Sequence, residues 1–60
     1  MQILIVEDHP EDRRLLRYAV ERHGHSAIEA VDGEEGLEQA ALHHPDLIIS
    51  DALMPRPDGF

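Results

Sequence analysis

Apolar residues gather in three short runs that alternate with longer segments of mixed polarity. Residues 2–6 are almost continuously apolar, and residues 47–50 repeat this pattern, which is typical of strands covered on both faces. Residues 26–31 form a weaker run between them. Apolar side chains recur at helical spacing after each of the first two runs. The chain therefore predicts a β-α-β-α-β order and an α/β fold with a parallel sheet.

The expected first helix has clear signals at both ends. Pro10 suits the first helical position because its backbone angle is already helical, and Gly24 suits the left-handed residue that ends a helix. The apolar stripe expected on this helix consists of Leu15, Leu16, Ala19 and Val20.

The expected second helix begins with a pattern that resembles a capping box. Asp32 is placed to cap the helix, and Glu35 is placed to reach back to the preceding backbone. Pro45, which follows two histidines, is expected to end the helix. The residues expected on one apolar face are Leu37, Ala40 and Ala41.

Acidic residues follow the first and third predicted strands. If the third strand lies on the other side of the first, the sheet order is 2-1-3 and the helices cover opposite faces. Ligands of such sheets bind beyond the carboxyl ends of the strands, where the connections diverge. Glu7 and Asp8 follow the first strand, and Asp51 follows the third. All three acids are therefore expected at one crevice.

Three like charges within several ångströms repel one another, by about 4 kcal/mol per pair at 4 Å and an effective dielectric constant of 20. A cation relieves this repulsion, and a few oxygen ligands suit Mg²⁺, which shares its other positions with water and phosphate. An aspartate beside such an ion can attack a phosphoryl group. The residues equally allow a structural interpretation, in which Glu7 and Asp8 favour the following helix terminus and Asp51 caps a loop.

Composition narrows the range of partners and compartments. The chain has 5 basic and 13 acidic residues, and its formal net charge of −8 argues against nucleic acid and against an anionic membrane surface as partners. There is no cysteine, which suits a reducing cytoplasm. Sixty residues make one small domain or a piece of a larger one, and the longest apolar runs are too short to cross a membrane.

Several short motifs occur together in a fixed order. They are Ile3-Leu4-Ile5-Val6-Glu7-Asp8-His9-Pro10, Gly24-His25, Ala30-Val31-Asp32-Gly33, Pro45-Asp46-Leu47-Ile48-Ile49-Ser50-Asp51, Met54-Pro55 and Asp58-Gly59. In this order and spacing, over essentially all 60 residues, the chain resembles the N-terminal half of a response-regulator receiver domain of two-component signalling. The resemblance implies a truncated flavodoxin-like fold with strand order 2-1-3.

The resemblance also implies roles for four residues. Asp51 would accept a phosphoryl group from the phosphohistidine of a sensor histidine kinase or phosphotransfer protein. Asp8 would ligate Mg²⁺ directly, Glu7 would act nearby, often through water, and the backbone carbonyl of Leu53 would complete the protein ligands. Many relatives have Asp where this chain has Glu7. Such a chain is a cytoplasmic phosphoacceptor of a signalling relay and is expected not to be an enzyme.

Receiver domains continue for two more strands and three more helices, so residues 1–60 are expected to form an incomplete domain. The later half supplies a Ser or Thr and a Lys that contact the phosphoryl group, and this sequence contains no lysine. The alternative is a catalytically silent half-receiver that acts as a structural or homodimerising fragment, joined through the open edge of the third strand. A haloacid-dehalogenase-like phosphohydrolase is a further alternative, but such an enzyme would have a second Asp two residues after the nucleophile, where this chain has Leu53.

Overall fold

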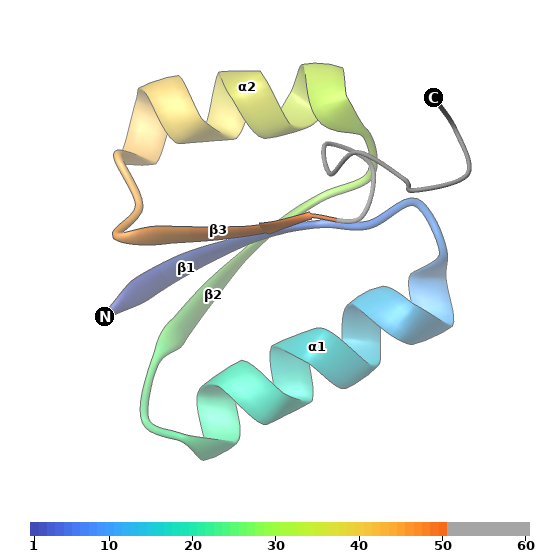
Figure 1. Cartoon of the computed structure of the whole chain (residues 1–60), viewed down its shortest axis with the longest axis vertical. Helices are drawn as coiled ribbons and strands as arrows, with labels where there is room; N and C mark the ends of the chain where they lie inside the picture. Colours follow the sequence, from blue (N-terminus) through green and yellow to red (C-terminus); the bar gives the residue numbers. More distant parts are fainter. Residues whose placement is uncertain (51–60) are drawn as a thin grey trace, which may run out of the picture.

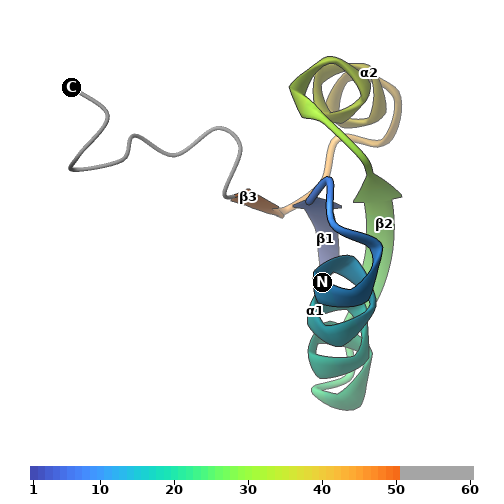
Figure 2. The ribbon, with the colours of Figure 1, turned by 90° about the vertical axis from the view of Figure 1, so that its right-hand side faces the viewer.

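Three parallel strands form the centre of the structure, a computed structural model that describes residues 1–50. The elements in chain order are β1 (Gln2–Val6), α1 (Pro10–Arg22), β2 (Ser26–Ala30), α2 (Gly33–His43) and β3 (Leu47–Ser50). The sheet order is β2-β1-β3, and β1 pairs in parallel with both neighbours. Helices α1 and α2 cover opposite faces of the sheet (Figures 1 and 2). The predicted element order and sheet order are confirmed.

Strand β1 lies at the centre of the core because both of its faces are covered. Its alternate side chains point to opposite sides of the sheet, and Leu4, Ile5 and Val6 are fully buried. On the α1 side, the packed residues are Ile3, Ile5, Leu16, Val20, Ala27 and Ile49. On the α2 side, they are Leu4, Val6, Ile28, Ala30 and Ala40. A strand buried on both faces explains the continuous apolar run in the sequence.

The end of α1 follows from the backbone freedom of Gly24. Its φ angle is +84°, in the left-handed region that glycine adopts without a Cβ penalty. The amide of Gly24 donates to the carbonyl of Glu21, and the amide of His25 donates to the carbonyl of Val20. These two bonds form a Schellman motif, which satisfies the last carbonyl groups of the helix. The predicted stop at Gly24 is confirmed.

The start of α2 is held by two reciprocal side-chain bonds. The Asp32 carboxylate accepts a hydrogen bond from the Glu35 amide at 2.8 Å. The Glu35 carboxylate accepts one from the Val31 amide at 2.7 Å, one residue before the expected position at Asp32. The helix ends at His43, and His44 takes a left-handed conformation with φ of 50° before Pro45. The predicted cap and stop are therefore confirmed.

The predicted buried faces of the two helices are partly wrong. Leu16 and Val20 pack against the sheet, whereas Leu15 is 67% exposed and Ala19 is also exposed. Leu16 and Val20 are four residues apart and share one line along the helix, while Leu15 is rotated by about 100° from Leu16. The sheet covers a narrower stripe of α1 than the apolar residues occupy.

In α2, the residues that face the sheet are small. Gly36 is buried and Ala40 packs against the core, whereas Leu37 is 69% exposed and Ala41 is exposed. A Cβ atom on Gly36 would lie 2.8 Å from Val6 Cγ2, so the helix approaches β1 as closely as a glycine allows. This close approach turns Leu37 away from the sheet and corrects the predicted face.

Strand β3 is less covered than β1. Both helices pack over β1 and β2, and Leu47 and Ile48 of β3 remain 48% and 47% exposed. The start of β3 is nevertheless fixed to β1, because the Asp46 amide donates to the Gln2 carbonyl and the Asp46 carboxylate accepts from the Gln2 amide, both at 2.8 Å. Neither helix within residues 1–50 is long and apolar enough to cross a membrane.

Candidate functional site

The carboxyl end of β1 presents two acidic residues with different environments. Glu7 is 7% exposed, and its amide continues the strand pairing by donating to the Ala30 carbonyl at 3.0 Å. Its carboxylate accepts a hydrogen bond from the His9 amide, also at 3.0 Å. Asp8, the next residue, is exposed. The strand therefore delivers one buried and one exposed carboxylate at the beginning of the loop that leads to α1.

Strand β3 runs parallel to β1, so its carboxyl end lies at the same end of the sheet as that of β1. Ser50, its last residue, is 6% exposed and is the register partner of Val6, the last residue of β1. Glu7 follows Val6 in the chain, and Asp51 follows Ser50. The predicted phosphoacceptor Asp51 and the predicted carbonyl ligand of Leu53 lie outside the described residues, so their roles stay predictions.

The environment of Glu7 fits a carboxylate that meets a cation. Among residues 1–50 its carboxylate takes part in no ion pair, and its oxygen atoms are of the type that ligates Mg²⁺. The same residues contain no group of three His, Asp or Glu side chains that could hold a metal ion by itself. The predicted Mg²⁺ site includes Asp51, so residues 1–50 supply two of its carboxylates, Glu7 and Asp8.

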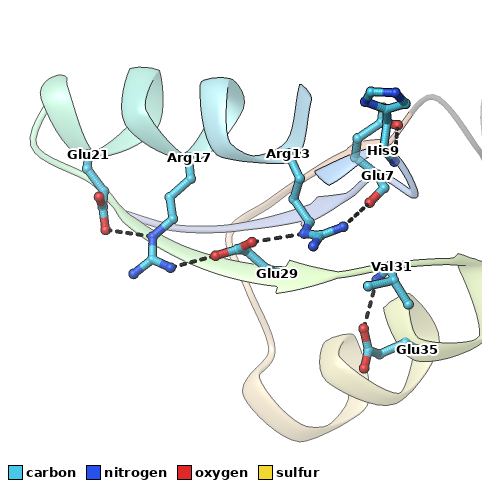
Figure 3. A network of polar contacts seen from close by, with 8 residues as sticks. All are labelled: Glu7, His9, Arg13, Arg17, Glu21, Glu29, Val31 and Glu35. Atoms are coloured by element: carbon cyan, nitrogen blue, oxygen red, sulfur yellow. Dashed lines mark hydrogen bonds and ion pairs between the residues drawn. The ribbon is translucent and has the colours of Figure 1, made fainter. Parts of the chain in front are cut away.

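A network of charged side chains adjoins Glu7 and was not predicted from the sequence (Figure 3). Arg13 and Arg17 of α1 both bind the carboxylate of Glu29 on β2, and Arg17 also binds Glu21. Arg13 in addition donates from Nη1 to the backbone carbonyl of Glu7 at 2.9 Å. The sequence signal was a glutamate within the predicted second strand, together with two arginines four residues apart on the predicted helix before it.

The network keeps Glu29 ionised. Hydrogen bonds from Arg17 lower the pKa of the Glu29 carboxyl below its ordinary value, partial burial opposes this, and Arg13 adds to the lowering. The pKa of Arg17 is raised by its hydrogen bonds to Glu29 and Glu21. Glu29 is consequently a carboxylate at neutral pH, and it holds the guanidinium of Arg13 from the side opposite Glu7.

Comparison with known proteins agrees with this architecture. The chain is 45% identical, over 97% of its length, to the alkaline phosphatase synthesis transcriptional regulatory protein PhoP of Bacillus subtilis, and covers 24% of that protein. It is 37% identical over 98% of its length to protein PilH of Pseudomonas aeruginosa, of which it covers 49%. It is also 42% identical, over its whole length, to sensor protein EvgS of Escherichia coli, of which it covers 5%.

A solved structure shows the same fold. It is the N-terminal domain of an uncharacterized protein from Wolinella succinogenes, with a TM-score of 0.81 and 43% sequence identity over 93% of this chain. The chain covers 45% of that structure and less than half of each of the three curated relatives above. Residues 3–60 match the response regulator receiver domain. The predicted resemblance is therefore confirmed, and the chain belongs to the response regulator receiver domain family.

Proposed function

We propose that this chain is a phosphoacceptor module of two-component signalling, in which Asp51 receives a phosphoryl group. The donor is the phosphohistidine of a sensor histidine kinase or of a phosphotransfer protein. A carboxylate oxygen of Asp51 forms a bond to phosphorus, the phosphorus–nitrogen bond breaks, and the imidazole nitrogen keeps the electron pair and takes up a proton. Membership of the receiver domain family supports this signalling role over that of a multi-turnover enzyme.

The observation that carries the proposal is the register of β1 and β3. Val6 and Ser50 are partners at the ends of two adjacent parallel strands, and in the sequence Glu7 follows Val6 and Asp51 follows Ser50. Parallel strands present the residues that follow them at one edge of the sheet, where ligands of open α/β sheets bind. This arrangement favours convergence of Asp51 with Glu7 and Asp8.

The residues proposed to hold Mg²⁺ are Asp8, Glu7, Asp51 and the backbone carbonyl of Leu53. All of these ligands are oxygen atoms, the type that Mg²⁺ prefers, and Glu7 is a buried carboxylate without a cationic partner among residues 1–50. A bound Mg²⁺ would neutralise charge that develops on the transferred phosphoryl oxygens. Glu7 and Asp8 would hold the ion beside Asp51, because the two carboxylates alone would repel an anionic phosphoryl group.

Phosphorylation with a small-molecule donor tests this function. The protein is incubated with phosphoramidate, with and without MgCl₂, and its intact mass is measured. We expect the addition of one phosphoryl group that requires Mg²⁺, and its loss in Asp51→Asn. Asp12→Asn is the matched control, because Asp12 is an exposed aspartate of the first turn of α1 and should leave labelling intact. Labelling that persists in Asp51→Asn would contradict the proposal.

A second candidate function is a homodimer joined through β3. Among residues 1–50, β3 pairs with β1 alone, and Leu47 and Ile48 are about half exposed. An open apolar edge favours pairing with a second copy, and a symmetric pair would be antiparallel. Light scattering at increasing concentration tests this arrangement, with Ile48→Lys expected to return a dimer to the mass of one chain. A single-chain mass at every concentration would exclude it.

The cytoplasm is the compartment expected for both functions. The absence of cysteine suits a reducing compartment, and the net charge of −8 disfavours direct contact with nucleic acid or an anionic membrane. Partner proteins for the phosphoacceptor function are therefore expected to be soluble domains or cytoplasmic domains of sensor kinases.

A further inference from the structure

The side chain of Arg13 joins two parts of the molecule that are distant in the sequence. It is 18% exposed, and its Nε donates to Glu29 Oε1 at 3.0 Å. Its Nη1 donates at 2.9 Å to the backbone carbonyl of Glu7 (Figure 3). One planar guanidinium therefore bridges strand β2 and the carboxyl end of β1. The ammonium group of a lysine is a single point donor and is less suited to bind two acceptors in this geometry.

Glu7 begins a short loop whose other contacts are local. The Glu7 carboxylate accepts from the His9 amide, and the His9 carbonyl accepts from the Arg13 amide at 2.9 Å. Arg13 therefore contacts both ends of the loop from Glu7 to His9, with its side chain at one end and its backbone at the other.

Glu29 gives the guanidinium of Arg13 a fixed and charge-balanced position. Its carboxylate is shared between Arg13 and Arg17, and both arginines project from the same face of α1. Arg17 also pairs with Glu21, so the network contains two positive and two negative charges. Arg13 therefore opposes a cation bound at the neighbouring acidic residues less than an unpaired arginine would. The arrangement holds the Glu7 carbonyl firmly and adds little net charge beside it.

We propose that Arg13, anchored by Glu29, is a positioning residue that fixes the junction between β1 and α1 so that Glu7 and Asp8 are presented to Mg²⁺. This inference rests on the proposed Mg²⁺-binding function. Residues that orient the ligands of a metal, without touching it, typically change metal affinity by about tenfold or more when they are removed. A role limited to attaching α1 to β2 would change stability and leave metal affinity unchanged.

The sign of the effect of Arg13→Gln separates positioning from simple electrostatics. Removal of a positive charge close to a cation site should by itself strengthen Mg²⁺ binding. If Arg13 positions Glu7 and Asp8, the same substitution should weaken binding, by about tenfold. Mg²⁺ titrations followed by the backbone amide chemical shifts of Glu7, Asp8 and His9 measure this affinity directly, without any phosphorylation.

Two matched variants serve as controls. Arg14→Gln removes the same charge from an exposed neighbouring position and should not weaken binding. Arg17→Gln removes ion pairs to Glu29 and Glu21 and has no contact with Glu7, so it should lower stability and leave the affinity within about twofold. Equal losses of Mg²⁺ affinity in Arg17→Gln and Arg13→Gln would show a general structural effect and overturn the inference.

Arg13→Lys is a second, milder variant that tests the same role if Arg13→Gln does not fold. Lysine keeps the charge and most of the aliphatic stem but not the fork that reaches two acceptors, so affinity should fall below that of the original protein. Wild-type affinity in Arg13→Lys and Arg13→Gln would overturn the positioning role and leave the proposed Mg²⁺ site standing. An original protein whose Glu7 and Asp8 amides do not respond to Mg²⁺ would overturn both.

Discussion

Gly36 of α2 lies directly against Val6 of β1. A methyl group on Gly36 would be 2.8 Å from Val6 Cγ2 and 3.4 Å from Val6 Cγ1, and the first of these distances is shorter than any normal carbon–carbon contact. Val6 is fully buried at the end of the central strand, immediately before Glu7. Helix α2 therefore packs against the end of β1 that carries Glu7, at a distance that leaves room only for a glycine.

Gly36→Ala should destabilise the protein. The added methyl group gains about 1 kcal/mol of helix propensity, but overpacking a buried contact costs about 1–3 kcal/mol, so we expect a net loss of about 1 kcal/mol. Urea unfolding followed by circular dichroism measures the change. In a Val6→Ala background the clash is removed, and the same substitution should become neutral or stabilising. A stabilising effect in the original background would contradict the close packing.

Adjacent leucines of α1 should differ strongly in their contribution to stability. Leu16 packs against the core residues on the α1 side, whereas Leu15 is 67% exposed. Leu16→Ala should lower the free energy of unfolding by about 2 kcal/mol, and Leu15→Ala by less than about 0.5 kcal/mol. The two substitutions remove the same atoms and serve as controls for one another. Equal losses of unfolding free energy would indicate that Leu15 is buried as well, as the sequence predicts.

The fold was predictable where the signals are local in the sequence. Pro10 and Gly24 act through their own backbone angles, and Asp32 acts through a hydrogen bond to a nearby amide. The ends of the helices therefore follow from residue type. The continuous apolar run of β1 likewise reflects burial on both faces. The rotation of each helix was not predictable, because the apolar residues of α1 and α2 cover more of the helix surface than the sheet does.

Only part of the candidate site was predictable from the sequence, again because only part of it depends on local signals. The position of Glu7 and Asp8 after β1 followed from the pattern of the sequence. The bridge from Arg13 to Glu29 joins residues 16 positions apart and depends on how α1 is rotated over β2, which the sequence does not specify. Asp51 and Leu53 lie outside the described residues, and their roles remain predictions.

Low pH should lower the free energy of unfolding through protonation of Glu29. The folded state lowers the pKa of this carboxyl, chiefly through Arg17, so its ion pairs stabilise the protein fully above the ordinary Glu pKa of about 4.3. This contribution is lost as the pH falls through the lowered pKa. Glu29→Gln should therefore cost about 1 kcal/mol near pH 7, and the difference from the original protein should shrink in acid.

The measurement for Glu29 is urea unfolding at a series of pH values between neutral and about pH 3. Glu38→Gln is the control, because Glu38 is an exposed glutamate of α2 that forms no ion pair within residues 1–50. Its stability profile should run parallel to that of the original protein. A constant difference between Glu29→Gln and the original protein at all pH values would rule out the titration of Glu29 as the cause.

Asp8→Asn distinguishes the two interpretations of the acidic residues. If Asp8 only favours the start of α1, neutralising it should destabilise the protein, as we expect for Asp12→Asn in the first helical turn. If Asp8 converges with Glu7 and Asp51, repulsion is relieved, and the metal-free protein should gain up to about 1 kcal/mol.

The Mg²⁺ dependence of the same variants supplies the second half of this test. Binding stabilises the folded state according to ligand concentration, so the original protein should gain about 1.4 kcal/mol at ten times its dissociation constant. Asp12→Asn should gain as much, because Asp12 is not among the proposed ligands, whereas Asp8→Asn should gain almost nothing. Unfolding curves with and without MgCl₂ measure both effects. A metal-free loss of stability in Asp8→Asn, together with an unchanged response to Mg²⁺, would assign Asp8 to the helix terminus and remove it from the metal site.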